Sequence, residues 1–483
     1  MSSYEDSPLH RITHPRSVAF WGASTNPLGM GTIQLSQLLE LGFEGPVYPI
    51  HPTDTRILGL DAYRSVKDVP GPVDLAVLIL PTRVVPETLE ECGKAGIRSA
   101  VIVSAGFGEV GPEGKVLQGR IVEIAKKYGI CFIGPNCIGV VNPHWKLNTT
   151  FFPYETKPGF VGMASQSGSF VTQIFAYLAN VGLGFSQGFS VGNEAMTDIT
   201  DCLEYLGECP DTKVVALYIE AIRRGRDFMR VAKEVSKKKP IVAFYVGGSE
   251  GGSKAGLSHT GALAGPDPLY DGVFQQCGII RAADIEELFD FCWVLGTQPL
   301  PEGNRIAILT HSGGPGAAAA DAADRCGLEL AELSSQTETE LKKLVPGTAS
   351  VKNPVDLTFA KNPNDYLEKL PQVLLNDPGV AGLFVYCLLP QSRVLKTLGA
   401  METSADKAGR LAAQYIQGQC AIVSSLSSKY GKPVVGGSYC NRTELFIREL
   451  HDQEFPVLPS PERAVRALGA LVRYARAKRA LLE

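Results

Sequence analysis

Short apolar runs alternate with helical stretches along the chain. Between residues 16 and about 145, five runs are each continuous and rich in valine and isoleucine: "SVAFWGAS", "PVYPIHP", "LAVLILP", "SAVIVSAGFGE" and "CFIGPNCIGVVNP". A continuous apolar run is typical of a parallel strand that is buried on both faces. Segments with helical character, such as "PETLEECGKAG" and "KVLQGRIVEIAKKYG", separate the runs. The pattern predicts a doubly wound α/β sheet, whose ligands bind at the carboxyl ends of the strands.

The pattern repeats in two further regions. From about 158 to 296 the expected strands are "GFVGMAS", "GFSQGFSV", "KVVALYIE", "PIVAFYVGG" and "CGIIRA". From about 303 to 470 they are "RIAILTHSGG", "ELAELS", "VAGLFVYCLLP", "KPVVGGSYC" and "FPVLPS", and a helix beginning at "SPERAV" closes the region. The proline- and glycine-containing stretches "YETKPG" and "TQPLPEGN" mark the boundaries. We therefore expect three domains, at residues 1–150, 151–298 and 299–483.

The second and third regions resemble each other. "MASQSGSFVTQIFAYLANVGL" and "ILTHSGGPGAAAADAADRCGL" each place a strand, a Ser-Gly turn, a helix and a Gly-Leu pair in the same order. The turn serines, Ser167 and Ser312, stand the same distance before Gly182 and Gly327. The likeness suggests a duplicated flavodoxin-like unit, although a strand–turn–helix pattern also recurs by chance.

Composition narrows the class of protein. A chain of 483 residues is too long for one core. With 46 basic and 50 acidic residues, the net charge of −4 gives no indication of a nucleic-acid or anionic-membrane partner. Eleven cysteines without a C-x-x-C pair predict reduced thiols. The polar start and the short apolar runs predict no signal peptide and no membrane span, so we expect a cytoplasmic protein.

Candidate chemistry gathers at the strand ends of the second region. Ser165 ends the first strand, and Ser167-Gly168-Ser169 opens a helix whose N–H groups and dipole favour an anion such as phosphate. Glu220 ends the third strand, and the glycine-rich "GGSEGGSKAGLSHTGALAG" after the fourth carries His259. Right-handed crossovers keep successive carboxyl ends on one edge, so we expect these groups to lie together. Glu220 would hold the proton on one nitrogen of His259, leaving the other as a nucleophile for a phosphoryl group.

Each of these residues also has a structural interpretation. A loop histidine such as His259 is often only solvated, Glu220 fits a strand-end salt bridge, and "SQSGS" fits ordinary helix capping. No histidine or cysteine lies near His259 in the sequence, which disfavours a metal site. Cys137 is interpreted as a packed thiol, with a direct chemical role as the alternative, and His311 in the third region has no equivalent of Glu220 at its strand end. "GASTNPLGMG" departs from G-x-G-x-x-G, which disfavours a nicotinamide-dependent oxidoreductase.

Four motifs carry a family resemblance. "FIGPNCIGVVNP", "ASQSGSF", "LYIE" and "GLSHTGALAG", in this order, resemble the α subunit of ADP-forming acetyl-CoA synthetases, relatives of succinyl-CoA synthetase, and the likeness covers nearly the whole chain. It implies a Rossmann-like CoA-binding domain followed by two flavodoxin-like doubly wound domains. It also implies that His259 is the phosphorylated histidine and Glu220 its orienting carboxylate. The implied phosphate-binding residues are Ser165, Gln166, Ser167, Gly168 and Ser169. The implied CoA-binding residues are Gly22, Ala23, Ser24, Pro81, Thr82, Ser104, Ala105, Gly106, Phe107, Asn136 and Cys137.

The resemblance further implies a reaction and a partner. The reaction is acyl-CoA + ADP + phosphate ⇌ carboxylic acid + CoA + ATP, through an acyl phosphate and a phosphohistidine that a glycine loop carries to ADP. In this family ADP and Mg²⁺ bind an ATP-grasp domain. Because the third region closes with a helix and no G-x-x-x-x-G-K-[ST] loop is present, we expect a separate β chain in an α₂β₂ assembly, and no metal site in this chain. The alternative is a non-catalytic protein that binds CoA or acyl-CoA on the same scaffold.

Overall fold

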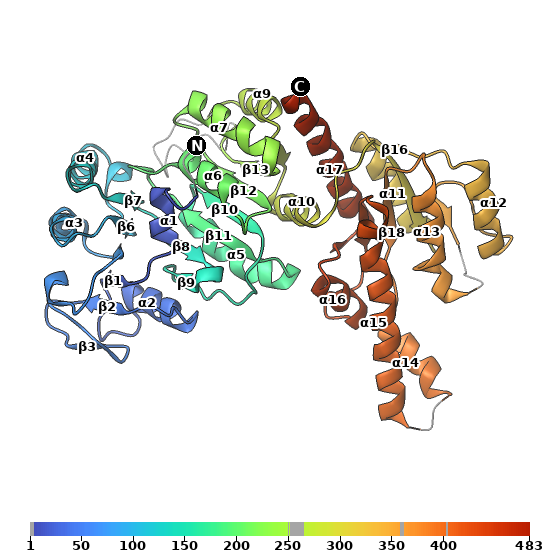
Figure 1. Cartoon of the computed structure of the whole chain (residues 1–483), viewed down its shortest axis with the longest axis horizontal. Coiled ribbons are helices and arrows are strands. Elements are labelled where there is room, and N and C mark those ends of the chain that lie inside the picture. The colour runs from blue at the N-terminus through green and yellow to red at the C-terminus, as the bar shows by residue number, and fades with distance from the viewer. Residues whose placement is uncertain (1–3, 250, 252–264, 358–361, 402–403) are drawn as a thin grey trace. The chain divides into compact units, whose positions relative to one another are not determined.

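The computed structural model describes residues 4–249, 251, 265–357, 362–401 and 404–483. It divides into two compact units, Met1–Ala282 and Ala283–Glu483, which Figure 1 colours from blue to yellow-green and from yellow to red. Two large sheets lie in the first unit and one in the second. The described chain therefore has the mixed α/β class that its apolar runs predict.

The first sheet is parallel and has the strand order β2-β1-β5-β6-β7. Its strands are β1 (Val18–Trp21), β2 (Val47–Ile50), β5 (Leu75–Leu78), β6 (Ser99–Ile102) and β7 (Cys131–Ile133), and a small hairpin, β3 (Arg56–Ile57) and β4 (Leu60–Asp61), lies beside it. Every residue of β1, β5 and β6 is buried, as expected of strands covered on both faces.

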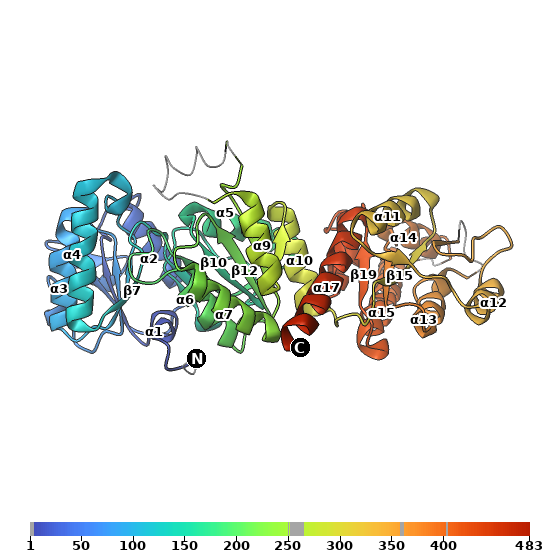
Figure 2. The same ribbon diagram turned by 90° about the horizontal axis from the view of Figure 1, so that it is seen from above.

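Helices cover both faces of this sheet. The helices are α1 (Pro8–Thr13), α2 (Met30–Glu40), α3 (Val85–Lys94) and α4 (Pro112–Tyr128). Helices α3 and α4 pack side by side on one face, and α2 lies on the other, toward the second sheet (Figure 2). This is the arrangement that right-handed crossovers produce when the chain leaves β1 in one direction for β2 and in the other for β5 to β7.

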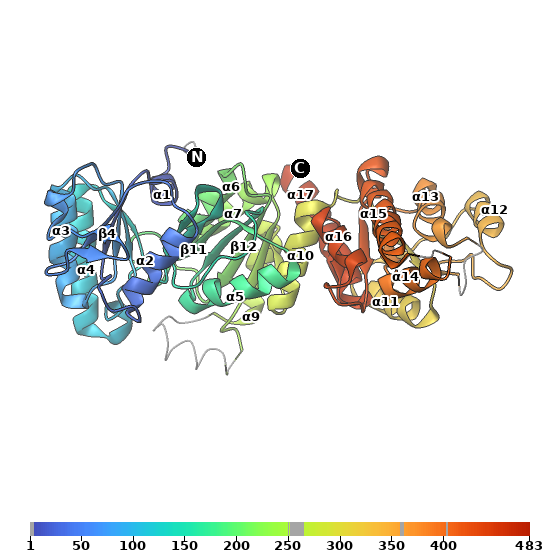
Figure 3. The same ribbon diagram turned by 90° about the horizontal axis from the view of Figure 1, so that it is seen from below.

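The second sheet has the strand order β14-β13-β12-β10-β11-β8-β9. Five strands are parallel: β10 (Val161–Ser165), β11 (Phe185–Ser190), β12 (Val214–Ile219), β13 (Ile241–Tyr245) and β14 (Ile280–Ala282). Its helices in this unit are α5 (Gly168–Val181), α6 (Ile199–Glu208), α7 (Gly225–Lys238) and α9 (Asp267–Cys277). Helix α5 lies on the face opposite to α6 and α7 (Figure 3).

The prediction of one strand over residues 131–143 was wrong. The run forms two strands that belong to different sheets: β7 ends the first sheet, and β8 (Val140–Asn142) pairs antiparallel with β11, with β9 (Leu147–Asn148) outside it. Gly134 and Asn136 have positive φ, at 100° and 58°, and Pro135 between them has no N–H to donate to a ladder. The chain therefore turns out of the first sheet at this point.

The turn after β7 is in direct backbone contact with the turn after β11. The N–H of Asn193 donates to the carbonyl of Pro135 at 2.9 Å, and that of Ala195 donates to the carbonyl of Gly134 at 3.2 Å. Gly192 has φ +57°, and a Cβ placed on it would lie 2.3 Å from the Pro135 carbonyl oxygen. Only glycine fits this position without a shift of the backbone. Gly192 therefore allows the close approach in which the hydrogen bonds of Asn193 and Ala195 join the carboxyl edges of the two sheets.

The second unit contains the third sheet. Its parallel order is β16-β15-β18-β19-β20, with β17 paired to β15. The strands are β15 (Arg305–Thr310), β16 (Glu329–Leu330), β17 (Val355–Asp356), β18 (Gly382–Tyr386), β19 (Val434–Gly437) and β20 (Val457–Leu458), and β17 was not predicted from the sequence. The helices are α10 (Ile285–Thr297), α11 (Gly313–Arg325), α12 (Ser335–Leu344), α13 (Lys369–Asn376), α14 (Gln391–Gly399), α15 (Ala405–Tyr430), α16 (Leu445–Asp452) and α17 (Pro461–Leu482).

The second and third sheets share their topology and their first turn. In chain order, the five main parallel strands of each lie as 2-1-3-4-5, the flavodoxin-like order, which the first sheet also follows, so the shared turn is the more specific likeness. At the end of the first strand of each sheet, a hydroxyl donates to the carbonyl of the helix-capping serine. Ser165 donates to Ser167 at 2.8 Å, and Thr310 donates to Ser312 at 2.8 Å. The likeness predicted from the two Ser-Gly turns is therefore present in the backbone.

Replacement of Gly192 tests the contact between the two turns. We expect Gly192→Ala to lower the free energy of unfolding by at least about 2 kcal/mol, because alanine is strained at positive φ and its methyl group meets the Pro135 carbonyl. Differential scanning calorimetry measures the change. Gly119→Ala is the matched control: Gly119 is exposed within α4, and its added Cβ meets no atom within 4 Å. A Gly192→Ala protein as stable as Gly119→Ala would contradict the assignment.

Candidate functional site

A cavity of about 1160 Å³ lies where the carboxyl edges of the first two sheets meet. This exceeds the range of about 300–1,000 Å³ that is common for small-molecule sites. The first sheet contributes residues that follow β5, β6 and β7, and the second contributes residues that follow β10, β11 and β12. Carboxyl ends of parallel strands are where doubly wound folds bind ligands.

Gln166 joins the ends of the two strands at which the order of the second sheet reverses. It follows β10, and its side-chain amide donates to the carbonyl of Ala221 at 2.6 Å. Its side-chain oxygen accepts the N–H groups of Glu220, at 2.6 Å, and Ala221, at 3.0 Å. The backbone that carries Glu220 is therefore fixed beside the start of α5, at the point where this class of sheet opens a crevice.

The start of α5 forms part of the cavity wall. Gly168 and Ser169 line the cavity, and Ser167 is the capping residue but makes no side-chain capping hydrogen bond. A Cβ on Gly168 would lie 2.8 Å from a side-chain carbon of Ile138, so the helix start packs closely on the loop from the first sheet. The first-turn amides and the positive end of the helix dipole thus border the cavity, an arrangement that favours an anion.

The opposite wall comes from the first sheet. The Ser104 hydroxyl joins the ends of β5 and β6, because it donates to the carbonyl of Leu80 at 2.7 Å and accepts its N–H at 2.9 Å. Asn136 lines the cavity and its side-chain amide donates to Asn193 at 3.1 Å. The Cys137 thiol donates to the carbonyl of Ile102 at 3.3 Å, and burial raises its pKa to about 12. The thiol is therefore packed and protonated near neutral pH, in agreement with the structural interpretation.

A polar network joins the two walls through Asn193. Its side-chain amide donates to the carboxylate of Glu109 and to Gln118, both of which line the cavity. Burial alone would raise the pKa of Glu109, but donation from Asn193 and from the N–H groups of Gly106 and Phe107 outweighs it and lowers the pKa. Glu109 is therefore held as a carboxylate.

Glu194, which follows Asn193 in the sequence, carries a second carboxyl group, and its pKa is shifted in the opposite direction to that of Glu109. Only 2% of its side chain is exposed; one oxygen accepts the N–H of Ile199 at 2.9 Å, and the other lies 3.0 Å from Nε of Arg223. Burial raises the pKa of Glu194 to about 7, against the opposing effects of Arg223, the Ile199 N–H and the Gln166 side chain. The carboxyl group therefore changes its charge near neutral pH.

The structure brings some of the predicted site residues together at the cavity, and others do not belong to its lining. Those that line it are Ser104, Ala105, Asn136, Cys137, Gln166, Gly168 and Ser169. Those that do not line it are Gly22, Ala23, Ser24, Pro81, Thr82, Gly106, Phe107, Ser165, Ser167 and Glu220. Glu220 is nonetheless adjacent to the lining residue Ala221, and its N–H is held by Gln166. His259 lies outside the described residues.

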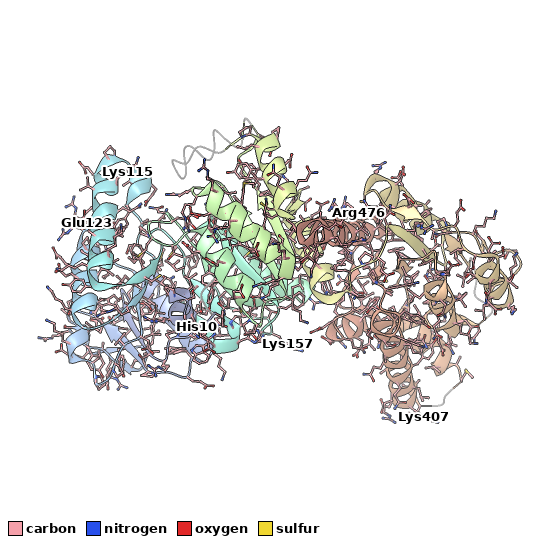
Figure 4. The ribbon with its side chains drawn as sticks, turned by 45° about the horizontal axis from the view of Figure 1, so that its top comes forward. His10, Lys115, Glu123, Lys157, Lys407 and Arg476 are labelled. Atoms are coloured by element: carbon pink, nitrogen blue, oxygen red, sulfur yellow. The ribbon has the colours of Figure 1, made fainter. Side chains whose placement is uncertain are left out.

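Several cavity residues were not predicted from the sequence. They are Glu109, Lys115, Gln118, Asn193 and Arg223 in the wall and Glu194 behind it. Lys115, labelled in Figure 4, lies near the start of α4, in a segment that the sequence analysis predicted only as a helix between strands. For Asn193 and Glu194 the available signal was "GNEAM" after the predicted strand "GFSQGFSV", because it places polar residues at a carboxyl end.

The described residues contain neither a candidate metal site nor a candidate membrane-spanning helix. Within these ranges no group of three or more His, Cys, Asp or Glu side chains has the arrangement of a metal site. No helix in the same ranges combines the length and apolarity that crossing a membrane requires.

Comparison with known proteins identifies the family. Three family models match successive parts of the chain: a CoA binding domain at residues 16–143, a succinyl-CoA ligase like flavodoxin domain at 158–295 and a Ligase-CoA domain at 306–482. Acetate–CoA ligase [ADP-forming] II subunit alpha of Pyrococcus furiosus is 40% identical over 469 residues, which cover 97% of this chain and 98% of that protein. The chain belongs to the ADP-forming acetate–CoA ligase family. The resemblance inferred from the four motifs is confirmed, as is the predicted fold class.

The chain is also similar to a longer member of the family and to a solved structure. Acetate–CoA ligase [ADP-forming] I of Archaeoglobus fulgidus is 36% identical, and this chain spans 64% of its length. The solved dinucleotide-forming acetyl-coenzyme A synthetase 1 of Ca. Korarchaeum cryptofilum, in complex with phosphate and ADP, is 35% identical with a TM-score of 0.86. The alignment covers 98% of each chain. The likeness to these ligases thus extends to the fold of nearly the whole chain.

The raised pKa of Glu194 predicts a dependence of stability on pH. Between pH 4.5 and about 7 the folded state holds this proton more tightly than the unfolded state does, so stability is lost as the pH rises through that window. Glu194→Gln has no proton to lose. Its free energy of unfolding should therefore rise relative to the wild type, by about 3 kcal/mol between pH 4.5 and 7.5. Urea denaturation at several pH values measures the difference.

Glu109→Gln is the control for this prediction. The pKa of Glu109 is lowered, so its contribution is present above pH 4.5 and is lost only below it. The difference between Glu109→Gln and the wild type should stay constant over the same window. A Glu194→Gln difference that is equally constant would show that Glu194 does not titrate there.

Proposed function

We propose that this chain is the subunit of an ADP-forming acyl-CoA synthetase in which the thioester and phosphoryl steps take place. The reaction is acyl-CoA + ADP + phosphate ⇌ carboxylic acid + CoA + ATP. The observation that carries the proposal is the cavity in which the carboxyl edge of the CoA-binding sheet faces the start of α5 and the end of β12. Family membership supports the class of reaction.

We propose domains at residues 1–150, 151–298 and 299–483.

The proposed steps begin with acyl-CoA bound at the first sheet. A phosphate oxygen attacks the thioester carbonyl, the carbon–sulfur bond breaks and CoA leaves as a thiol, taking up the proton that phosphate gives up. A ring nitrogen of His259 then attacks the phosphorus of the acyl phosphate, and the carboxylate leaves. Glu220 would hold the proton on the other ring nitrogen, and the amides at Gly168 and Ser169 would stabilise the charge of the transferred group. The predicted CoA and phosphate residues keep these roles as part of the proposal.

The phosphoryl group would then pass to ADP on a second chain. The relative from Pyrococcus furiosus is named a subunit alpha, which supports a partner subunit. We propose that the partner is an ATP-grasp β subunit that holds ADP and Mg²⁺, in an α₂β₂ assembly in the cytoplasm. The second chain would exclude water from the phosphohistidine while transfer takes place.

The proposed division of labour predicts the behaviour of the chain by itself. We expect the purified chain to bind CoA but to form no ATP from acetyl-CoA, phosphate and ADP, because the nucleotide site is on the partner. Addition of an ATP-grasp subunit from the same source should start ATP formation, measured with a luciferase assay. Robust ATP synthesis by the chain alone would contradict the proposed location of the nucleotide site.

Labelling tests the roles of His259 and Glu220. With acetyl-CoA and radioactive phosphate, the chain should acquire an acid-labile, base-stable label that His259→Ala abolishes while CoA binding stays within about twofold. Glu220→Gln should reduce the label without loss of folding, because the amide does not stabilise the positive charge that develops on the ring. If the wild type binds CoA and acquires no label, the chain is a CoA-binding protein and not the proposed enzyme.

A further inference from the structure

Arg223 is a cation of the cavity wall that the proposed reaction has not yet used. It follows the end of β12, two residues after Ala221, and lines the cavity with 48% of its side chain exposed. Within the described part of the chain, its ion pair is with Glu194 and involves Nε. This ion pair engages Nε, and a guanidinium presents its further donors in a planar fork that suits phosphate and carboxylate oxygens.

The neighbouring arginine shows the contrast. Arg224 donates from Nε and Nη2 to the carboxylate of Asp198, and Nη2 also donates to Asp201. Asp198 caps α6, so this arginine braces the start of that helix. Arg224 thus binds protein carboxylates through both Nε and Nη2, and it does not line the cavity.

The carboxylate that pairs with Arg223, that of Glu194, is buried and held in place by several contacts. Surface arginines need no buried partner, and a buried carboxylate is costly unless it is paired and hydrogen-bonded. Glu194 is held from three sides: by its position in the turn that contacts the first sheet, by the N–H of Ile199 and by Arg223 itself. Such a partner limits the rotamers of Arg223 and fixes the direction of its Nη groups, which reduces the entropy that ligand binding costs.

We propose that Arg223 contacts the oxygens of phosphate in the cavity and that Glu194 is its positioning residue. The inference rests on the proposed function, and it adds a cation to the phosphate-binding end of that site. Arg223 belongs to the same sheet edge as Gln166 and Gly168, whereas Lys115, the other cation of the wall, belongs to the first sheet. The ligand of Arg223 is therefore inorganic phosphate, or the phosphoryl group of the acyl phosphate, and not a phosphate of CoA.

Steady-state kinetics of the complex with its ATP-grasp subunit test the proposal. Arg223→Gln should raise the KM for phosphate about ten- to hundredfold, the effect of losing one charge-assisted contact, and leave the KM for acetyl-CoA within about twofold. Arg223→Lys should recover part of the loss, because it restores the charge without the fork. Glu194→Gln should raise the KM for phosphate by a smaller factor, about three- to tenfold.

Two control variants separate the possible outcomes. Arg226→Gln changes an exposed arginine outside the cavity and should behave as the wild type. Lys115→Gln should raise the KM for acetyl-CoA more than that for phosphate. The proposal is overturned if Arg223→Gln behaves as Arg226→Gln, or if it raises the KM for acetyl-CoA in place of that for phosphate. It is also overturned if Arg223→Lys is as impaired as Arg223→Gln.

The outcome is independent of whether ADP-dependent turnover is found. If the complex forms no ATP, the proposed reaction fails, and ³¹P NMR titration of the chain alone with inorganic phosphate still tests the contact. The wild type and Arg226→Gln should broaden the phosphate signal in a saturable way. Arg223→Gln should not. Equal broadening by Arg223→Gln and the wild type overturns the proposal, and thermal melts of each variant verify that it is folded.

Discussion

The turn after β7 and the turn after β11 touch through their backbones, and the cavity depends on that contact. Two N–H groups of the second turn donate to carbonyls of the first, and Gly192 leaves no side chain between them. Because two strand-end turns meet, the carboxyl edges of two separate sheets face each other. One doubly wound sheet offers a crevice, and two that meet in this way form the walls of a larger, open cavity of about 1160 Å³.

The same contact creates two carboxyl groups with opposite properties. Asn193 and Glu194 follow Gly192 directly. The Asn193 amide points to Glu109 and helps to keep it ionised, whereas the Glu194 side chain contacts Ile199 and Arg223 beside the second sheet, where burial raises its pKa to about 7. Hydrogen-bond donors decide the first case and desolvation decides the second. The cavity thus has a fixed negative charge on one wall, at Glu109, and a group that changes its charge behind the other, at Glu194.

The side chain of Gln166 restrains the segment that follows β12 through hydrogen bonds, in addition to the packing of the sheet. The residue comes from the end of β10, and three hydrogen bonds from its side chain hold the backbone at Glu220 and Ala221. β10 and β12 pair directly, but the strand order reverses between them, so the segments that follow them diverge and are not held together by the ladder. One amide side chain supplies that restraint, and the apolar residues of β10 and β12 support it from the buried side of the sheet.

Most of the fold was predictable from local patterns, because a strand buried on both faces needs a continuous apolar run. The runs at β1, β5, β10, β12 and β15 each became a strand, and the Ser-Gly turns became the starts of α5 and α11. The four motifs also led to the right family. The split of residues 131–143 between two sheets was missed, because apolar spacing does not indicate which sheet a strand joins.

Tertiary structure alone decided which polar residues share the cavity. Glu109, Lys115, Asn193 and Arg223 line it and Glu194 lies behind it, and all five come from segments typical of an ordinary turn, helix or loop, with no motif among their neighbours in sequence. Their meeting depends on the angle and register at which two sheets pack, which is set by backbone contacts between distant turns. A sequence determines where chains turn and which faces are buried. The charge of Glu194 and the direction of Arg223 follow from burial and pairing, which exist only after the sheets have met.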